Sequence, residues 1–235
     1  MIIVIHSQPN SFCIWMSNII QIFARRLPCA IQTPMGHSKA SKANTHARLV
    51  AAAAARFKER GVDGISLSDL MKELKLTHGG FYKHFDSRDE LVTEALELAL
   101  TETGQAMREH LFDGDKPDIG ALLDFYLSEA HRDGRAGGCA VAALAVDASR
   151  KSAEVQAQFR RQIETNLVTL SAALGPGGSA GDSRAAAILI LSALYGALIM
   201  ARAVGDSPLS REVLRTVRKR ILNLSGPAKK TVGPR

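Results

Sequence analysis

Apolar residues recur at spacings of three and four along most of the chain after residue 44, which is the period of an α-helix with one buried face. The first of these stripes consists of Leu49, Val50, Ala53 and Phe57. Gly61 follows it and is suited to a left-handed helix end. Alanine and leucine are abundant while aromatic residues make up only 5%, which favours helix over strand. The pattern predicts an all-α protein.

Hydroxyl side chains mark the starts of helices between residues 66 and 91. Ser66 followed by Asp69, and Ser87 followed by Glu90, have the spacing of a capping box, in which a side chain accepts a hydrogen bond from a backbone N–H three residues later. Thr77 comes after a short turn and is suited to cap the helix between them. The spacing predicts two short helices joined by a tight turn, followed by a long helix that ends near residue 111.

Glycine and proline interrupt the helical pattern in the second half of the chain, at residues 112–118 and again at residues 134–138. The remaining apolar stripes predict helices over residues 119–132, 139–149, 151–174, 183–204 and 208–224. The chain is therefore expected to consist of an extension over 1–43 that is disordered or mis-called, a small domain over 44–104, a larger domain over 105–225 and a disordered tail over 226–235.

Charge is distributed unevenly along the chain. Residues 1–60 hold eight Lys or Arg and one Glu, and residues 208–235 again hold eight Lys or Arg and one Glu. The segment between them is acidic, although the whole chain carries a net charge of +7. A basic front end beside an acidic body indicates that one end meets a polyanion.

Cysteine usage and apolar segments bear on the compartment. Cys13, Cys29 and Cys139 are far apart and have neither disulfide-framework nor zinc-site spacing, which favours a reduced, cytoplasmic setting. Residues 185–201 carry no charge but are slightly short for a membrane span of about 20 residues. We expect this segment to be a helix at a dimer interface and expect no membrane association.

The second short helix gathers residues suited to a DNA groove. The major groove is wide enough to admit a helix, whose N-terminal residues then reach base edges. Gly79 and Gly80 each cost a helix roughly 1 kcal/mol relative to alanine, and close approach to DNA is one reason to keep them. Around them lie side chains that can bond to bases or phosphates, namely Thr77, His78, Tyr82, Lys83 and His84.

The same segment resembles the TetR family of bacterial transcriptional regulators over about residues 44–95. The residues that carry the resemblance are Thr77, Gly79, Tyr82, His84, Phe85, Ser87, Arg88 and Leu91. The family often has glycine in the turn where this chain has Lys75, and a non-glycine residue is tolerated there at a modest cost. The resemblance implies an N-terminal domain with a helix-turn-helix at about 66–85, followed by a helical effector-binding and dimerisation domain.

The resemblance also implies which residues contact DNA. Ser66 and Ser68 are expected to touch phosphate, and Arg88 to touch phosphate from the start of the next helix. The residues nearest the bases would be Thr77, His78 and Gly80, with Gly79 at the same N-terminal end of the helix, and those that hold the DNA backbone would be Tyr82, Lys83 and His84. Phe81, Phe85 and Leu91 are expected in the core instead. His78 and His84 lie six residues apart, on different faces of a helix, so no metal site is expected.

By the same resemblance, the larger domain forms a homodimer through about 183–204 and 208–224, and the dimer binds a palindromic, double-stranded DNA operator. A small-molecule effector is expected between its helices, and no cofactor is expected. Candidate effector-binding residues are Phe125, Tyr126, Cys139, Leu144, Phe159, Ile163 and Tyr195, each of which also suits an ordinary helix core. Cys139 follows two glycines and could cap a helix, where the helix dipole would lower the pKa of its thiol.

The sequence therefore predicts a cytoplasmic, ligand-responsive transcriptional repressor. Two other functions stay open at this point. One is a DNA-binding module that responds to no effector. The other is an enzyme that uses Cys139 with His131 and Asp147, although nothing in the sequence brings those three residues together.

Overall fold

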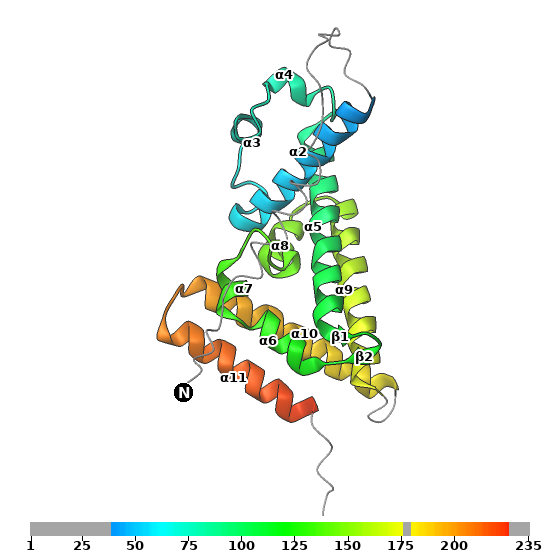
Figure 1. The fold of residues 1–235 in the computed structure, drawn as a ribbon, viewed down its shortest axis with the longest axis vertical. Helices are drawn as coiled ribbons and strands as arrows, with labels where there is room; N and C mark the ends of the chain where they lie inside the picture. The colour runs from blue at the N-terminus through cyan, green and yellow to red at the C-terminus, as the bar shows by residue number, and fades with distance from the viewer. Residues whose placement is uncertain (1–38, 176–179, 226–235) are drawn as a thin grey trace, which may run out of the picture. The chain divides into compact units, whose positions relative to one another are not determined.

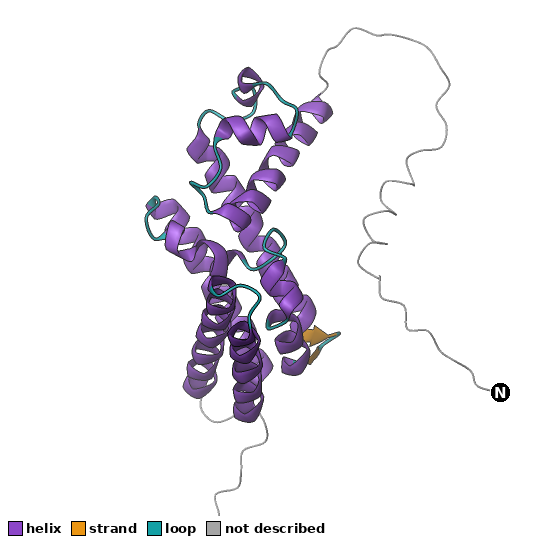
Figure 2. Ribbon diagram, turned by 90° about the vertical axis from the view of Figure 1, so that its left-hand side faces the viewer, coloured by secondary structure: helices purple, strands orange, loops and turns teal. Residues whose placement is uncertain are grey.

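The structure is a computed structural model that describes residues 39–175 and 180–225. Within these ranges the chain is helical except for its loops and one short hairpin (Figure 2). Residues 1–38 of the extension expected over 1–43, and the tail expected over 226–235, lie outside the described residues, while residues 39–43 are helical. The all-α prediction is confirmed.

The N-terminal helices are α2 (Lys39–Arg60), α3 (Leu67–Glu73) and α4 (His78–Phe81), and they precede the long helix α5 (Arg88–Leu111). Helix α2 begins earlier than the predicted start near residue 44, because the added turn consists of alanine, lysine and serine, which a helix accepts. Phe57, Phe81 and Phe85 are almost completely buried beneath these helices. α2 also packs against α5, so one apolar core joins the short helices to the long one.

The predicted caps form as expected. The side-chain oxygens of Ser66, Thr77 and Ser87 each accept a hydrogen bond from the backbone N–H three residues later, at 3.1, 3.2 and 3.1 Å. Lys75, in the turn between α3 and α4, has a φ of +57°. This left-handed conformation is the one that glycine adopts most easily, and here lysine adopts it.

The predicted hinge over residues 112–118 is a tight hairpin of β1 (Phe112–Asp113) and β2 (Lys116–Pro117), which pair antiparallel. The prediction of one helix over 119–132 is wrong, because the segment forms α6 (Ile119–Tyr126) and α7 (Glu129–Asp133). Ser128 explains the break. Its hydroxyl donates to the Phe125 carbonyl and accepts from the His131 N–H, so a side chain replaces the helical hydrogen bonds there.

The rest of the larger domain consists of α8 (Ala140–Ala148), α9 (Ala153–Leu174), α10 (Ala180–Ala203) and α11 (Pro208–Ser225). Helices α5 and α9 lie side by side, and α10 packs against both α9 and α11 (Figure 1). Helix α8 contacts α5, α9 and α10 and also reaches α2. It therefore joins the interior of the larger domain to the N-terminal helices.

The α10 segment Asp182–Ala203 is long and apolar enough to cross a membrane by length and composition alone. One of its faces is buried against neighbouring helices, through residues that include Ala187, Leu191, Leu194 and Leu198. Core packing accounts for that face, and such a helix does not by itself indicate a membrane protein.

Candidate nucleic-acid interface and interior pocket

Helix α4 presents one face to solvent because its other face is anchored. Phe81 is fully buried and stacks on Phe85, with 5.3 Å between ring centroids. The next residue, Tyr82, is 59% exposed. The predicted DNA-contacting residues that are exposed are Ser66, Ser68, Thr77, His78, Gly79, Tyr82 and Lys83, while Gly80 and His84 are half-buried. The start of α3 and the solvent face of α4 thus have the residues expected to approach DNA.

The hydroxyls of Ser66 and Thr77 also cap helices, and they differ in whether their own proton is still free to be donated to DNA. The Ser66 hydroxyl donates to the Asp69 carboxylate at 2.6 Å while accepting from the Asp69 N–H. Thr77 accepts from the Gly80 N–H, which leaves its own proton free to be donated. Thr77 is therefore the better placed of the two to donate to a phosphate or a base.

Arg88, expected to contact phosphate, also has partners inside the protein. Its guanidinium donates to the Val62 carbonyl at 2.6 Å and lies within 3.3 Å of the Ile65 carbonyl oxygen, and it forms an ion pair with Asp63. These partners all belong to the loop between α2 and α3. Arg88 therefore fixes that loop to the start of α5, and its contact with phosphate stays a prediction.

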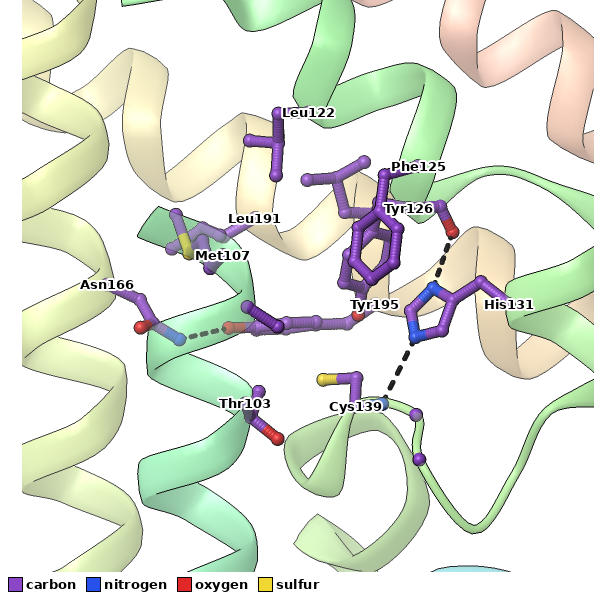
Figure 3. Close-up of a pocket in the computed structure, with 14 residues that line it drawn as sticks. Thr103, Met107, Leu122, Phe125, Tyr126, His131, Cys139, Asn166, Leu191 and Tyr195 are labelled. Carbon is purple, nitrogen blue, oxygen red and sulfur yellow. Dashed lines mark hydrogen bonds between the residues drawn. The ribbon is translucent and has the colours of Figure 1, made fainter. Parts of the chain in front are cut away.

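A second site lies inside the larger domain, between α5, α6, α9, α10 and the start of α8 (Figure 3). Four of the predicted effector-binding residues line it, namely Phe125, Tyr126, Cys139 and Tyr195. The other three do not. Leu144 is fully buried in the core, and Phe159 and Ile163 line a separate, more open groove along α9.

The sequence prediction missed several residues of this pocket, among them Thr103, Met107 and Asn166, and it considered His131 only as a catalytic group. A polar residue on an otherwise apolar helix face is the signal that could have found Thr103 and Asn166. Thr103 Oγ1 donates to the Ala99 carbonyl and accepts from the Ala140 N–H. It thereby connects α5 to the first residue of α8.

His131 fastens the loop before α8 to the end of α6. Its Nδ1 is 2.8 Å from the Tyr126 carbonyl oxygen, and its Nε2 is 3.1 Å from the Cys139 backbone nitrogen. A carbonyl can only accept and an N–H can only donate, so the imidazole is neutral with its proton on Nδ1. Burial lowers the pKa of His131, which keeps this form.

This geometry gives a pH-dependence of stability. The pKa of His131 is depressed in the folded protein, so its contribution is complete above about pH 6.5, the pKa of an unperturbed histidine, and is lost as pH falls further. We expect the free energy of unfolding to decrease below that pH by up to about 1.4 kcal/mol per pH unit. Urea denaturation between pH 8 and pH 5 measures this slope, which His131→Gln should reduce. His78→Gln, at an exposed histidine, should leave it unchanged, and parallel curves for wild type and His131→Gln would contradict the assignment.

Cys139 caps α8, since its Sγ accepts from the Ala142 N–H at 3.4 Å. The expected lowering of its thiol pKa is wrong, because burial raises the pKa of Cys139. Desolvation of the thiolate outweighs the favourable end of a nine-residue helix. The pairing proposed for an enzyme also fails, because His131 Nε2 bonds to the Cys139 backbone rather than to its sulfur.

The other end of α8 contacts the N-terminal domain. Asp147 Oδ2 accepts a hydrogen bond of 2.9 Å from the Val62 N–H, in the loop between α2 and α3. Gly61 permits this approach, since it has a φ of +81° and a Cβ there would lie 3.0 Å from Asp147 Oδ2. One helix therefore begins at the pocket, at Cys139, and ends on the loop that leads into α3.

Known protein families match both the N-terminal helices and the larger domain. A family model described as bacterial regulatory proteins of the tetR family matches residues 49–95, and one described as the C-terminal domain of LmrA/YxaF-like transcriptional regulators matches residues 117–219. An uncharacterized HTH-type transcriptional regulator of Mycobacterium tuberculosis strain H37Rv is 26% identical over 169 residues, which cover 68% of this chain and 84% of the relative.

Two further likenesses extend this result. The HTH-type transcriptional repressor NemR of Escherichia coli K12 is 24% identical over 143 residues, which cover 60% of this chain and 72% of NemR. The crystal structure of a TetR transcriptional regulator from Chloroflexus aurantiacus superposes with a TM-score of 0.67 at 25% identity, covering 78% of this chain and 95% of that one.

The fold and the two sites define a helical transcriptional regulator with a helix-turn-helix domain in front of a larger helical domain. The two family models together match most of the described residues. The chain belongs to the TetR family, and it is a DNA-binding transcriptional regulator rather than an enzyme.

Proposed function

We propose that this protein is a cytoplasmic, homodimeric repressor that binds a palindromic, double-stranded DNA operator and releases it when a small molecule occupies the interior pocket. The observation that carries the proposal is the path of α8. Its first residue bonds to Thr103 in the pocket wall, and Asp147 near its last residue bonds to the backbone of the α2–α3 loop. A ligand that moves the start of α8 thus acts on the domain that holds α4.

The operator-contacting residues in this proposal are Ser66, Ser68, Thr77, His78, Gly79, Gly80, Tyr82, Lys83 and His84. Ser66 and Ser68 lie at the start of α3, and the others lie on or beside α4, which is anchored by Phe81 and capped by Thr77. The effector-contacting residues are Phe125, Tyr126, Cys139 and Tyr195. NemR is named a transcriptional repressor, which supports repression here.

The surface proposed for dimerisation is the exposed side of α10, with α11 beside it. Four apolar residues of α10 are roughly half exposed (46–58%), namely Ile188, Leu189, Ile199 and Met200. They repeat after eleven residues, or about three helical turns, so they share one face. Gly196 lies between them, and a Cβ added there would meet no neighbouring side chain or helix within 4 Å. An apolar face with a small residue at its centre suits close packing against the same helix of a second copy.

Salt dependence of operator binding tests the DNA surface. Operator fragments selected from the producing organism's genome would be titrated by fluorescence anisotropy at several salt concentrations. Removing one phosphate contact is expected to reduce the slope of log affinity against log salt by about one, and we expect this of Lys83→Ala. Lys116→Ala removes an equal charge from the exposed hairpin and should leave the slope unchanged. Equal slopes for wild type and Lys83→Ala would contradict the docking of α4.

An effector-independent DNA-binding module is the second candidate function. The contacts of α8 favour the ligand-responsive protein, because a module without an effector has no use for a connection between an interior pocket and the α2–α3 loop. If a ligand binds in the pocket but leaves the operator affinity unchanged, the effector-independent module would be favoured instead.

A further inference from the structure

Three side chains that could accept a hydrogen bond in the interior pocket, those of Thr103, Asn166 and His131, are already engaged inside the protein. Thr103 Oγ1 accepts from a backbone N–H of α8, and Asn166 Oδ1 accepts from a glutamine one turn earlier on α9. His131 Nε2 accepts from a backbone N–H as well. Among the described residues that line the pocket, none is a carboxylate. Apart from the tyrosine hydroxyls, which can both donate and accept, the side chains of the pocket therefore offer a ligand few free acceptors.

The tyrosine hydroxyls of the pocket, in contrast, have protons that remain to be donated. The side chain of Tyr126 is buried to more than nine-tenths, and its hydroxyl has no hydrogen-bond partner in the described part of the chain. The neighbouring Cys139 thiol is at best a weak partner. The Tyr195 hydroxyl accepts from Asn166 Nδ2 at 3.0 Å, which leaves its own proton to be donated. The two tyrosine rings lie 6.3 Å apart and extend from α6 and α10 into the same pocket (Figure 3).

The charge near the pocket also favours a ligand that accepts hydrogen bonds. Arg202, on α10, donates to the carbonyl oxygens of His131 and Arg132 at 3.0 and 3.1 Å. It lies against the pocket wall, where a Cβ at Gly138 would be 2.6 Å from its Nη2. A guanidinium behind the wall, with no carboxylate in the lining, attracts an acceptor oxygen and repels a cationic ligand.

The size of the pocket sets how a ligand enters. About 20 Å³ is free, which is room for about one water molecule. A larger ligand therefore has to move side chains, and Met107 is the lining residue best suited to move because it is long and unbranched. The walls beyond the polar groups are apolar, from Leu122, Leu191 and Leu194.

We propose that the pocket takes a small, mainly apolar molecule that carries a carbonyl or a comparable acceptor oxygen, that the hydroxyls of Tyr126 and Tyr195 donate to this oxygen, and that ammonium compounds are rejected. The inference rests on the proposed function, in which the same pocket is the effector site. It adds the chemical class of the effector.

The test compares two probes of the same carbon skeleton, acetophenone and 1-phenylethylammonium, by ligand-observed NMR and calorimetry on the full chain. Acetophenone is expected to bind at millimolar concentration, and the ammonium compound at least about tenfold more weakly. Tyr126→Phe removes one hydrogen bond and should weaken acetophenone binding about five- to tenfold. The same variant should keep or raise the thermal midpoint, since it removes an unpartnered hydroxyl. Tyr82→Phe, at an exposed tyrosine outside the pocket, is the matched control and should leave binding unchanged.

Three results would overturn the proposal: no acetophenone binding, equal or tighter binding of the ammonium compound, or an affinity for acetophenone that Tyr126→Phe and Tyr195→Phe leave unchanged. A lower thermal midpoint for Tyr126→Phe would also overturn it, because the hydroxyl would then already be satisfied by water. Operator release is measured separately. If acetophenone binds through the tyrosines but does not release the operator, the ligand-responsive function is refuted and the ligand class stands. If only the ammonium compound releases the operator, the ligand class is refuted and the ligand-responsive function stands.

Discussion

Replacing Phe81 by alanine is expected to lower the free energy of unfolding by about 3–5 kcal/mol and to abolish operator binding at the same time. Phe81 is fully buried and stacks on Phe85 beneath α4. Helix α4 spans only His78–Phe81, which is too short to be stable by itself. Its position therefore depends on this one aromatic anchor, and a small domain has only about 5–15 kcal/mol of total stability to lose.

The neighbouring residue provides a matched control. Tyr82 is 59% exposed, so Tyr82→Ala should change the unfolding free energy by less than about 0.5 kcal/mol while weakening operator binding about tenfold. Urea denaturation and fluorescence anisotropy measure the two effects. If Tyr82→Ala destabilised the protein as much as Phe81→Ala, or if Phe81→Ala still bound the operator normally, the assignment of faces to α4 would be wrong.

Asp147→Ala is expected to reduce the response of operator binding to a pocket ligand while leaving ligand binding intact. The Asp147 carboxylate accepts from the Val62 N–H at 2.9 Å, and a hydrogen bond to a charged group contributes about 1.5–3 kcal/mol. Coupling between two sites is typically worth about 1–3 kcal/mol, or 5- to 150-fold in affinity. Loss of this contact therefore removes a large share of the coupling. The nearby ion pair of Lys151 with Asp63 is exposed and contributes much less.

The measurement is operator affinity with and without saturating acetophenone, together with hydrogen exchange of the Val62 amide. Asp147→Ala should speed that exchange and bring the two operator affinities together. Asp147→Asn keeps an acceptor without the charge and is expected to fall between wild type and alanine. Asp115→Ala, at an exposed aspartate in the hairpin turn, is the control. A full ligand response in Asp147→Ala would show that α8 does not carry the coupling through this bond.

The features that the sequence predicted correctly are local ones. Ser66, Thr77 and Ser87 each bond to a backbone N–H only three residues away, so their spacing alone contains the interaction. The apolar period likewise separates Phe81 from Tyr82, because neighbours on a helix face about 100° apart. The break at Ser128 is also local, yet apolar periodicity hid it, since the sequence does not show whether a serine extends a helix or caps a new one.

The sequence by itself determined the all-α fold, the helix starts near α4 and the division of α4 into a buried and an exposed face. The tertiary structure alone decided the roles of Arg88, His131 and Asp147. The partner of Arg88 lies 26 residues away in the chain and that of Asp147 lies 85 away. Both ring nitrogens of His131 bond to residues only five and eight positions away, yet they reach them because the chain around α7 brings the end of α6 to the start of α8. Such contacts arise only when packed helices bring distant segments together, and no local spacing in the sequence records which segments will meet.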